Sequence, residues 1–258
     1  NAFSTIYELF FAGIYTVAED PIMLKHVYKI HPMGNKYSLY FKLKMNGFKP
    51  LYLWNGEERI YVDSGKDVIK KLMETIPRDH CLITDVGTSA IYTSTLFKTK
   101  ESGRSLLYNF AMGSLGFAIP ASIGANIARP ESCIVTLVGD GSFGFTAGEL
   151  ETVSRIGLNN NLILFNNMSY GWIRAEWILS YGDEYVDFAT KFKPIDYQKI
   201  AEGFGLSSYL VTKPNELKEV LLEAFNNREP TFIELGVKAE DELIPPVPSW
   251  IKKAKQKG

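Results

Sequence analysis

Two short polar segments near the middle of the chain carry residue types that bind metal ions and phosphates. Residues 139–142 read Gly-Asp-Gly-Ser and follow an apolar run, and Asn166 and Asn167 follow the next one. Carboxylate and amide oxygens are hard ligands that suit Mg²⁺, and glycines permit a tight turn whose backbone amides approach an anion. We therefore expect Asp140 and Asn167 to share one Mg²⁺ beside a diphosphate, with a backbone carbonyl such as that of Ser169 as a further ligand.

These segments can meet only if the apolar runs before them are neighbouring parallel strands. The runs 134–138 and 162–165 are predominantly apolar, which is typical of strands covered by helices on both faces of a sheet. Ligands of open parallel sheets bind outside the carboxyl ends of the strands. A Gly-Asp-Gly turn or an Asn pair alone is common in loops, so the prediction depends on the two segments together.

Strand and helix signals alternate over residues 66–240. This alternation predicts one α/β domain with a doubly wound, mainly parallel sheet and helices on both faces. The expected helices span 68–76, 115–128, 147–156, 197–204 and 215–226, and the expected strands span 81–84, 133–138, 162–165, 208–211 and 231–235.

The segments on either side of this domain have a different character. Residues 1–65 are rich in aromatic residues and Lys, and their alternating pattern predicts β structure. An Asn-Gly pair at 55–56 is typical of a hairpin turn between strands at 51–54 and 59–62. We expect this segment to be a linker, a remnant of a central domain or a docking element. The tail, residues 241–258, is Pro-rich with a basic end and is expected to be extended.

The composition narrows the class of partner and the location. In 258 residues, 28 Lys and Arg against 29 Asp and Glu give a formal net charge of −1, which argues against nucleic acid or an anionic membrane as a partner. Cys81 and Cys133 lack a CxxC spacing, which excludes zinc, iron–sulfur and disulfide frameworks and fits the reducing cytoplasm. The apolar start, residues 3–17, is too short to span a bilayer.

Three sequence blocks, one of which contains the Asn pair, share their order and spacing with a known family. They are DVGTS at 85–89, GSLGFAIPA at 113–121 and NNMSYG at 166–171. Together the blocks resemble the thiamine diphosphate-dependent enzymes, whose cofactor motif starts with GDG and ends with an Asn pair. The resemblance covers residues 68–240, the diphosphate-binding (PP) domain. It is greatest to the group of acetolactate synthase, pyruvate oxidase, benzoylformate decarboxylase and pyruvate decarboxylase.

The resemblance implies a role for each residue that matches the family's motifs. Asp140, Asn167 and the carbonyl of Ser169 would coordinate Mg²⁺, which neutralises the diphosphate. The implied cofactor-binding residues are Thr88, Gly141 and Ser142, which would donate hydrogen bonds to phosphate oxygens, together with Gly87, Gly113, Leu115, Gly139, Asp140, Asn167, Ser169, Tyr170 and Gly171.

Two residues would activate the cofactor if the resemblance holds. The carbonyl of Gly113 would accept a hydrogen bond from the 4′-amino group of the cofactor. Leu115 would be the apolar wedge that bends the cofactor, so that its own nitrogen removes the C2 proton and C2 adds to a carbonyl. From the residue alone, a core role is the default for an apolar side chain such as Leu115 at a helix start.

In this family the cofactor lies between the PP domain and a pyrimidine-binding (PYR) domain, which supplies a Glu that hydrogen-bonds the ring. No Glu in residues 1–65 has the matching pattern, and the segment is too short for such a domain. The chain does not begin with Met, so we expect a fragment, or a subunit whose PYR half comes from another chain. The site would then lie at an interface in a homo- or hetero-oligomer.

The leading hypothesis is an enzyme that uses thiamine diphosphate and Mg²⁺ to decarboxylate a small 2-oxo acid, with or without carboligation to an acetolactate-like product. A second hypothesis is a lyase related to 2-hydroxyacyl-CoA lyase or oxalyl-CoA decarboxylase, which would bind an acyl-CoA. A third is a non-catalytic assembly subunit, against which the intact Asp140 and Asn167 count. An ordinary nucleotide-binding protein is disfavoured, because neither GxGxxG nor GxxxxGK[ST] follows any strand.

Other candidate residues carry weaker signals. His80 precedes a strand without a partner motif and is expected at the surface. Trp172, Arg174 and Trp177 follow the Asn pair, where members of the resembling family place residues that face the substrate. Packing is the alternative for these three side chains.

Overall fold

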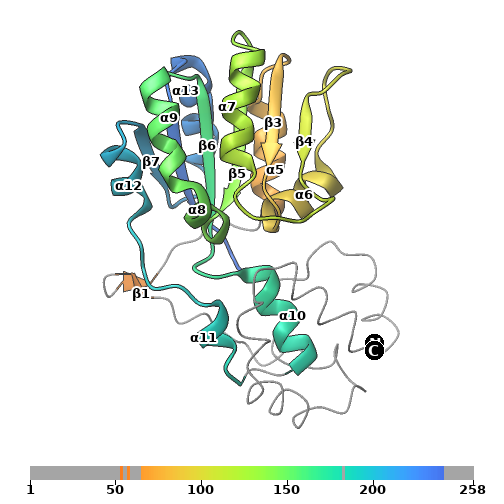
Figure 1. Ribbon diagram of the computed structural model, residues 1–258, viewed down its shortest axis with the longest axis vertical. Helices are drawn as coiled ribbons and strands as arrows, with labels where there is room; N and C mark the ends of the chain where they lie inside the picture. The colour runs from red at the N-terminus through yellow and green to blue at the C-terminus, as the bar shows by residue number, and fades with distance from the viewer. Residues whose placement is uncertain (1–52, 55–56, 59–64, 182–183, 241–258) are drawn as a thin grey trace.

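The structure of the chain is a computed structural model that describes residues 65–181 and 184–240 and two short strands at 53–54 and 57–58. Within these ranges the main body is a six-stranded parallel sheet with helices on both faces (Figure 1). The predicted doubly wound α/β class is therefore confirmed.

The main sheet is built from six strands: β3 (His80–Thr84), β4 (Leu106–Tyr108), β5 (Cys133–Gly139), β6 (Asn160–Asn166), β7 (Ser207–Val211) and β8 (Thr231–Gly236). Their order is β4-β3-β5-β6-β8-β7, and each neighbouring pair is parallel. The strands β3, β6 and β8 are buried over their whole length, which explains their continuous apolar runs.

The helices lie mainly on the two faces of this sheet. Their bounds are α5 (Gly65–Thr75), α6 (Thr88–Leu96), α7 (Ala118–Ala128), α8 (Asp140–Thr146), the 3₁₀ turn η1 (Ala147–Glu149), α9 (Leu150–Ile156), α10 (Gly171–Tyr181), α11 (Val186–Thr190), α12 (Tyr197–Gly203) and α13 (Leu217–Asn227). The helices α5, α6 and α13 pack on one face, and α7, α9 and α12 on the other. Among the helices of the described ranges, none combines the length and the apolarity needed to cross a membrane.

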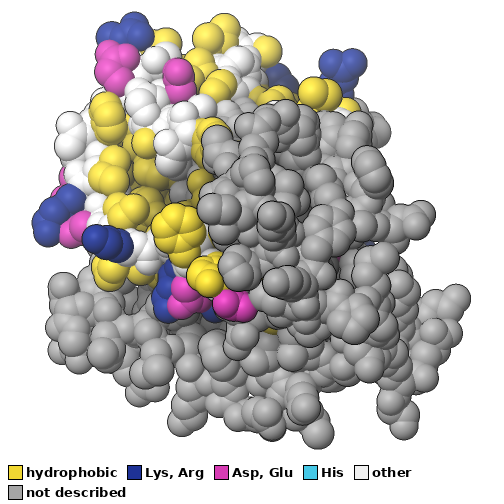
Figure 2. Space-filling model, turned by 60° about the horizontal axis from the view of Figure 1, so that its bottom comes forward, with side chains coloured by type: hydrophobic (Ala, Val, Ile, Leu, Met, Phe, Trp, Pro, Cys, Tyr) yellow, Lys and Arg dark blue, Asp and Glu magenta, His cyan; other side chains and the backbone are white. Residues whose placement is uncertain are grey.

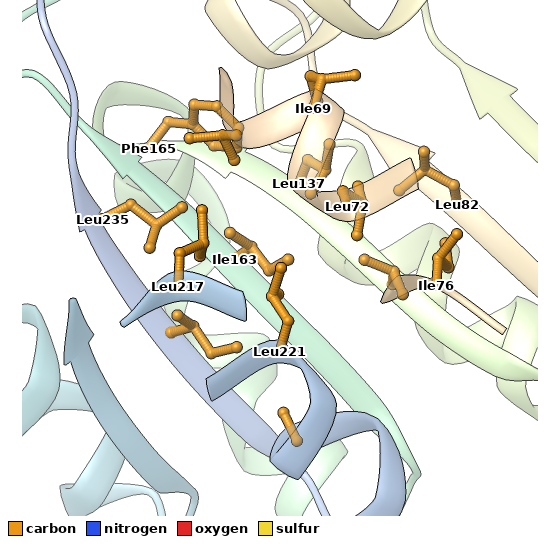
Figure 3. Packing of buried hydrophobic residues seen from close by; sticks show 14 of the residues in the cluster. Ile69, Leu72, Ile76, Leu82, Leu137, Ile163, Phe165, Leu217, Leu221 and Leu235 are labelled. Carbon is orange, nitrogen blue, oxygen red and sulfur yellow. The ribbon is translucent and has the colours of Figure 1, made fainter. Parts of the chain in front are cut away.

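One core lies between the sheet and the helices α5 and α13 (Figure 3). Alternate residues of the central strands point to this face, such as Leu137 of β5 and Ile163 of β6. They meet Leu72 of α5 and Leu221 of α13, and these side chains are fully buried. The apolar positions of α5 recur at helical spacing, so one stripe of the helix faces the strands.

The opposite face of the sheet carries a second core. Ile134 of β5 and Leu162 of β6 are offset by one residue from their neighbours in the first core, so they point the other way. They pack with Ile119 of α7 and Val153 of α9. Because both faces are covered, the strands are held rigidly and the segments that follow them have fixed starting points.

The strand order reverses direction between β3 and β5. The connection after β3 leads outward to β4 at one edge, whereas the connection after β5 leads through β6 toward the other edge. The two connections therefore diverge beyond the carboxyl ends of β3 and β5. This topological switch point, which we call the crevice, is where open α/β sheets bind ligands. Asp85 follows β3 and Asp140 follows β5 at this point.

Two predicted helices begin later than expected, while the other predicted helices and strands agree within a few residues. The helix predicted at 115–128 begins at Ala118, because Gly116 has a φ of +84°, which is left-handed backbone outside the helical region. The helix predicted at 147–156 begins at Leu150, and α8 and η1 precede it. The elements α6, β4, α8, α10 and α11 are not among those predicted from the sequence.

A small antiparallel hairpin precedes the main body in the sequence. In it, β1 (Leu53–Trp54) pairs with β2 (Glu57–Glu58), which confirms the predicted hairpin. The second strand begins earlier than the predicted 59–62. The other predictions for residues 1–65, and that of an extended tail at 241–258, lie outside the described residues.

The prediction that His80 lies at the surface is wrong. This residue opens β3 and its side chain is fully buried. Its Nδ1 lies 2.8 Å from the carbonyl oxygen of Pro77, and its ring contacts Phe97 edge-on. The side chain packs at the amino end of the strand, whereas the crevice lies at the carboxyl ends.

Two adjacent leucines of α13 test the first core. Leu221 is fully buried and Leu222 is 42% exposed. We expect Leu221→Ala to lower the free energy of unfolding by about 2–5 kcal/mol, because it leaves a cavity between α13 and the sheet. Leu222→Ala is the matched control and should cost less than about 1 kcal/mol. Urea unfolding followed by circular dichroism measures both values, and equal costs would contradict the packing described here.

Candidate functional site

The register of the sheet brings the two predicted polar segments side by side. Gly139, the last residue of β5, lies opposite Phe165 of β6 in the parallel ladder. Asp140 and Asn166 are the next residues on the two strands, and Asn167 follows. Because adjacent parallel strands lie ~5 Å apart, the two segments start within side-chain reach of each other.

A glycine and a tyrosine show that the segments are in contact. Asp140 is the first residue of α8 and is 4% exposed, and its Oδ1 accepts a hydrogen bond of 2.9 Å from the N–H of Gly141. A Cβ on Gly141 would lie 2.5 Å from the ring of Tyr170. Burial, and in second place the charge of Asp140, raise the pKa of Tyr170 above its ordinary value. The loop after β6 therefore packs directly on the start of α8.

The Asn pair is fixed by hydrogen bonds on both side chains. The Nδ2 of Asn166 donates to Glu234 Oε1 at 2.6 Å, which turns this side chain toward β8. The Oδ1 of Asn167 accepts from the N–H and the hydroxyl of Ser169, at 3.0 and 3.2 Å. Rotation of the Ser169 hydroxyl would release a lone pair of this oxygen, so Asn167 can offer it to a cation.

The residue between Asn167 and Ser169 has an unusual backbone. Met168 has a φ of +61° and its side chain is buried. A left-handed conformation is disfavoured for a residue other than Gly, and such residues cluster at functional loops. The N–H of Phe192 donates to the Met168 carbonyl at 2.8 Å and holds this turn in place.

Asp85 organises the loop that precedes α7. It is fully buried, and its Oδ2 accepts hydrogen bonds from the N–H groups of Gly116 and Ala118 at 3.1 and 3.2 Å. The hydroxyl oxygen of Ser142 also accepts from Gly116, at 3.0 Å. The sequence analysis included Asp85 in a motif without giving it this role. Its position directly after a buried strand is the signal that could have identified it.

The implied cofactor-activating residues lie in this same loop. Gly113 has a φ of +66°, and its N–H donates to the carbonyl of Asn109 at 3.1 Å. The Nδ2 of Asn109 also donates to the carbonyl of Ser114 at 2.9 Å. Leu115 is half-buried in the turn before α7 and belongs to neither of the two cores described above. A core role therefore does not account for this side chain.

Apolar side chains are exposed beside this loop. Phe110 is 50% exposed, Met112 65% and Phe145 59%. Figure 2 shows a group of hydrophobic side chains on the described part of the surface. Apolar patches of this kind mark surfaces at which other protein elements dock.

A buried carboxylate that the sequence analysis missed lies across the crevice. Glu240 follows β8, is 2% exposed and accepts a short hydrogen bond from the hydroxyl of Thr88. Its other oxygen lies 3.4 Å from Nδ2 of Asn167. Gly171 has no room for a side chain, because a Cβ there would collide with Glu240 and Asn167. No sequence motif marks Glu240, since its position depends on the fold.

The structure favours packing for two of the aromatic and basic residues in α10. Arg174 is buried and donates to Asp187, and Trp177 belongs to a small core with Ile178 and Val186. Partial burial raises the pKa of Asp187, but the hydrogen bond and charge of Arg174 outweigh this effect, so that the pKa is lowered. Both α10 side chains therefore have structural partners. Trp172 is half-buried.

The residues implied by the family motifs lie at the last residue of β5 or in the segments that follow β3, β4, β5 and β6, at the carboxyl end of the sheet. In the described part of the chain, no group of three or more His, Cys, Asp or Glu is placed to hold a metal ion. The donors that the family motifs imply are one carboxylate, one amide oxygen and a backbone carbonyl. An oxygen-only set with a single carboxylate suits Mg²⁺, which retains water and phosphate ligands, better than Zn²⁺. The residues therefore fit a cation that is bound together with a phosphate ligand.

A parallel α/β domain with glycine-lined loops and oxygen donors at its topological switch point is the architecture of a phosphate-binding domain. Comparison with known families agrees with this class. Residues 85–235 match the family model of the thiamine pyrophosphate enzyme, C-terminal TPP binding domain. The chain belongs to this family.

Individual relatives are similar over the same part of the chain. A probable acetolactate synthase large subunit from Methanocaldococcus jannaschii is 31% identical over 186 residues, 70% of this chain and 31% of the relative. The acetolactate synthase of Bacillus subtilis is 32% identical over 178 residues, 69% of this chain and 30% of the relative. A putative thiamine pyrophosphate-containing protein, YdaP, of the same organism is 28% identical over 193 residues, 75% of this chain and 32% of the relative. The match thus spans about a third of the length of these relatives.

Two glycines of α8 test the contact between α8 and the loop after β6. A Cβ on Gly141 would collide with the ring of Tyr170, whereas a Cβ on Gly144 would meet no atom within 4 Å. We expect Gly141→Ala to destabilise the protein by about 1–3 kcal/mol, since the ring must move. The matched control Gly144→Ala should be neutral or stabilise it by up to about 1 kcal/mol. Chemical denaturation measures both, and equal stabilities would show that Tyr170 does not pack on Gly141.

Proposed function

We propose that this chain is the diphosphate- and Mg²⁺-binding part of a thiamine diphosphate-dependent enzyme. The enzyme would resemble acetolactate synthase and act on 2-oxo acids by decarboxylation, carboligation or both. The observation that carries the proposal is the register that sets Gly139 opposite Phe165, so that the segments of Asp140 and Asn167 start from neighbouring strand ends. Residues 66–240 form the proposed PP domain.

The proposed cation site uses the donors that this register collects. Asp140 contributes a carboxylate oxygen, Asn167 its amide oxygen and Ser169 its backbone carbonyl. These three leave positions for water and for diphosphate oxygens in an octahedral shell. The positive charge of the cation would offset the repulsion between Asp140 and the diphosphate.

The proposed phosphate donors come from both sides of the crevice. Ser142 accepts a hydrogen bond from Gly116 through its oxygen, so its hydroxyl hydrogen can donate to a phosphate. Thr88 begins α6 on the other side, and the N–H of Gly141 lies at the start of α8. Gly87 and Gly139 precede these helices and permit the backbone of each loop to approach the ligand.

The proposed activation of the cofactor depends on the loop held by Asp85. Bound thiamine diphosphate supplies a nucleophilic carbon that adds to the carbonyl group of a 2-oxo acid. The Gly113 carbonyl would hold the amino group of the pyrimidine ring, and Leu115 would support the bent shape of the cofactor. Tyr170 and Gly171 would complete the wall of the site beside Asn167.

We further propose that a PYR domain from another subunit or from a further segment completes the site in an oligomer. The exposed side chains of Phe110, Met112 and Phe145 support docking of another domain at this edge. The similarity over about a third of each relative agrees with a part that needs other domains.

We propose the cytoplasm as the location. Cys81 and Cys133 are free, buried thiols. Burial, and in second place the charge of Asp79, raise the pKa of Cys133 to about 12, and burial also raises the pKa of Cys81. Thiols that stay protonated and reduced suit a reducing compartment.

Titration calorimetry of the assembled protein with thiamine diphosphate tests the proposed site. Binding should require Mg²⁺, disappear in excess chelator and return when Mg²⁺ is restored. Asp140→Ala should weaken it by about 100-fold or more, because the site loses its only proposed carboxylate. Asp79→Asn is the control. Asp79 lies just before β3, at the amino ends of the strands, in an exposed ion pair with Arg129. No binding by the unaltered protein, or equal binding by Asp140→Ala, would refute the proposal.

A further inference from the structure

Glu240 lies at the crevice without a role in the function proposed above. The chain reaches it from the end of β8, where the N–H of Val237 donates to the carbonyl of Asn166 at 3.0 Å. This bond holds the segment after β8 alongside the Asn pair. Glu240 is 2% exposed, so its carboxylate is held inside the protein.

The contacts of this carboxylate come from two different loops. Oε1 accepts from the hydroxyl of Thr88, which follows β3. Oε2 lies 3.4 Å from Nδ2 of Asn167, which follows β6, and it packs on the bare Cα of Gly171. Burial, and in second place the charge of Glu240, raise the pKa of Tyr92 to about 12.

Glu240 contacts one proposed phosphate donor and one proposed ligand of the cation. Thr88 is a proposed donor to phosphate, and Asn167 is a proposed ligand of the cation. An oxygen of a carboxylate and an oxygen of a phosphate accept the same kind of hydrogen bond. A diphosphate that approached Thr88 while Glu240 remained in place would bring two anions together in a buried site, which is strongly unfavourable.

We propose that the Glu240 carboxylate holds the place of a phosphate group in the cofactor-free domain and is displaced from Thr88 when the diphosphate binds. The inference rests on the proposed function, because it assumes that the diphosphate binds at this crevice. Glu240 then lowers the affinity for anionic ligands in proportion to their charge. It also selects for ligands that bring a cation and enough phosphate oxygens to replace the contacts of Glu240 with Thr88 and Asn167.

Charge removal at Glu240 tests this inference in the assembled protein. Glu240→Gln keeps the size of the side chain and removes the charge that opposes the diphosphate. With Mg²⁺ present, calorimetry should show that it binds thiamine diphosphate about tenfold tighter or more than the unaltered protein. The gain should be smaller for thiamine monophosphate and absent for thiamine.

The chain offers a matched control in Glu234. This residue is equally buried, and its carboxylate accepts a hydrogen bond from Asn166, the other member of the Asn pair. Glu234 is bonded to Asn166 of β6, whereas Glu240 is bonded to Thr88. Glu234→Gln should therefore give no charge-dependent gain across the three ligands. Thermal unfolding of each variant separates a loss of fold from a change in binding.

Each outcome decides the inference. Equal affinities of Glu240→Gln and the unaltered protein would overturn it and leave the proposed function intact. Weaker binding by Glu240→Gln would also overturn it, by showing that Glu240 helps to hold the cation. If neither protein binds thiamine diphosphate, the proposed function fails as well. If Glu240→Gln does not fold, Glu240→Asp replaces it, and its shorter carboxylate should still tighten binding of the diphosphate and not of thiamine.

Discussion

The pairing of β5 with β6 is the constraint on which the rest of the site depends. Their parallel register sets Gly139 against Phe165, so the chain leaves both strands at the same edge of the sheet. Helices cover the sheet on both faces, and this leaves the strand ends little freedom to move. The proposed cation site between Asp140 and Asn167 therefore rests on two backbone segments that start from neighbouring strand ends.

Buried polar groups turn these strand ends into an ordered site. Asp85 and Glu234 are buried carboxylates, and each accepts hydrogen bonds from groups that shape a neighbouring loop. A buried charge is costly unless it is bonded, so these contacts fix the loops as well as stabilising the carboxylates. Glu240 differs from them because it contacts Thr88 and Asn167, which are proposed to bind the ligand.

Much of the fold could be predicted from the sequence, because apolar runs and the polar residues that end them are local features of the chain. Apolar runs bounded by turn residues marked the central strands. The polar residues that close β5 and β6 marked the end of the sheet at which Asp140 and Asn167 lie. The sequence could not predict α6, whose Ser- and Thr-rich stretch has weak helical preference and forms in contact with α5 and the sheet. It also gave no sign of the contact of Glu240 with Thr88, since these residues are far apart along the chain and only the fold joins them.

Anomalous scattering from Mn²⁺, which takes the same oxygen ligands as Mg²⁺, tests the central claim most directly. Crystals of the assembled protein grown with thiamine diphosphate and Mn²⁺ should show one strong peak within about 2.5 Å of oxygens from both Asp140 and Asn167. A peak whose ligands include neither side chain would contradict the account, because the two strand ends would then have no joint role in holding the cofactor.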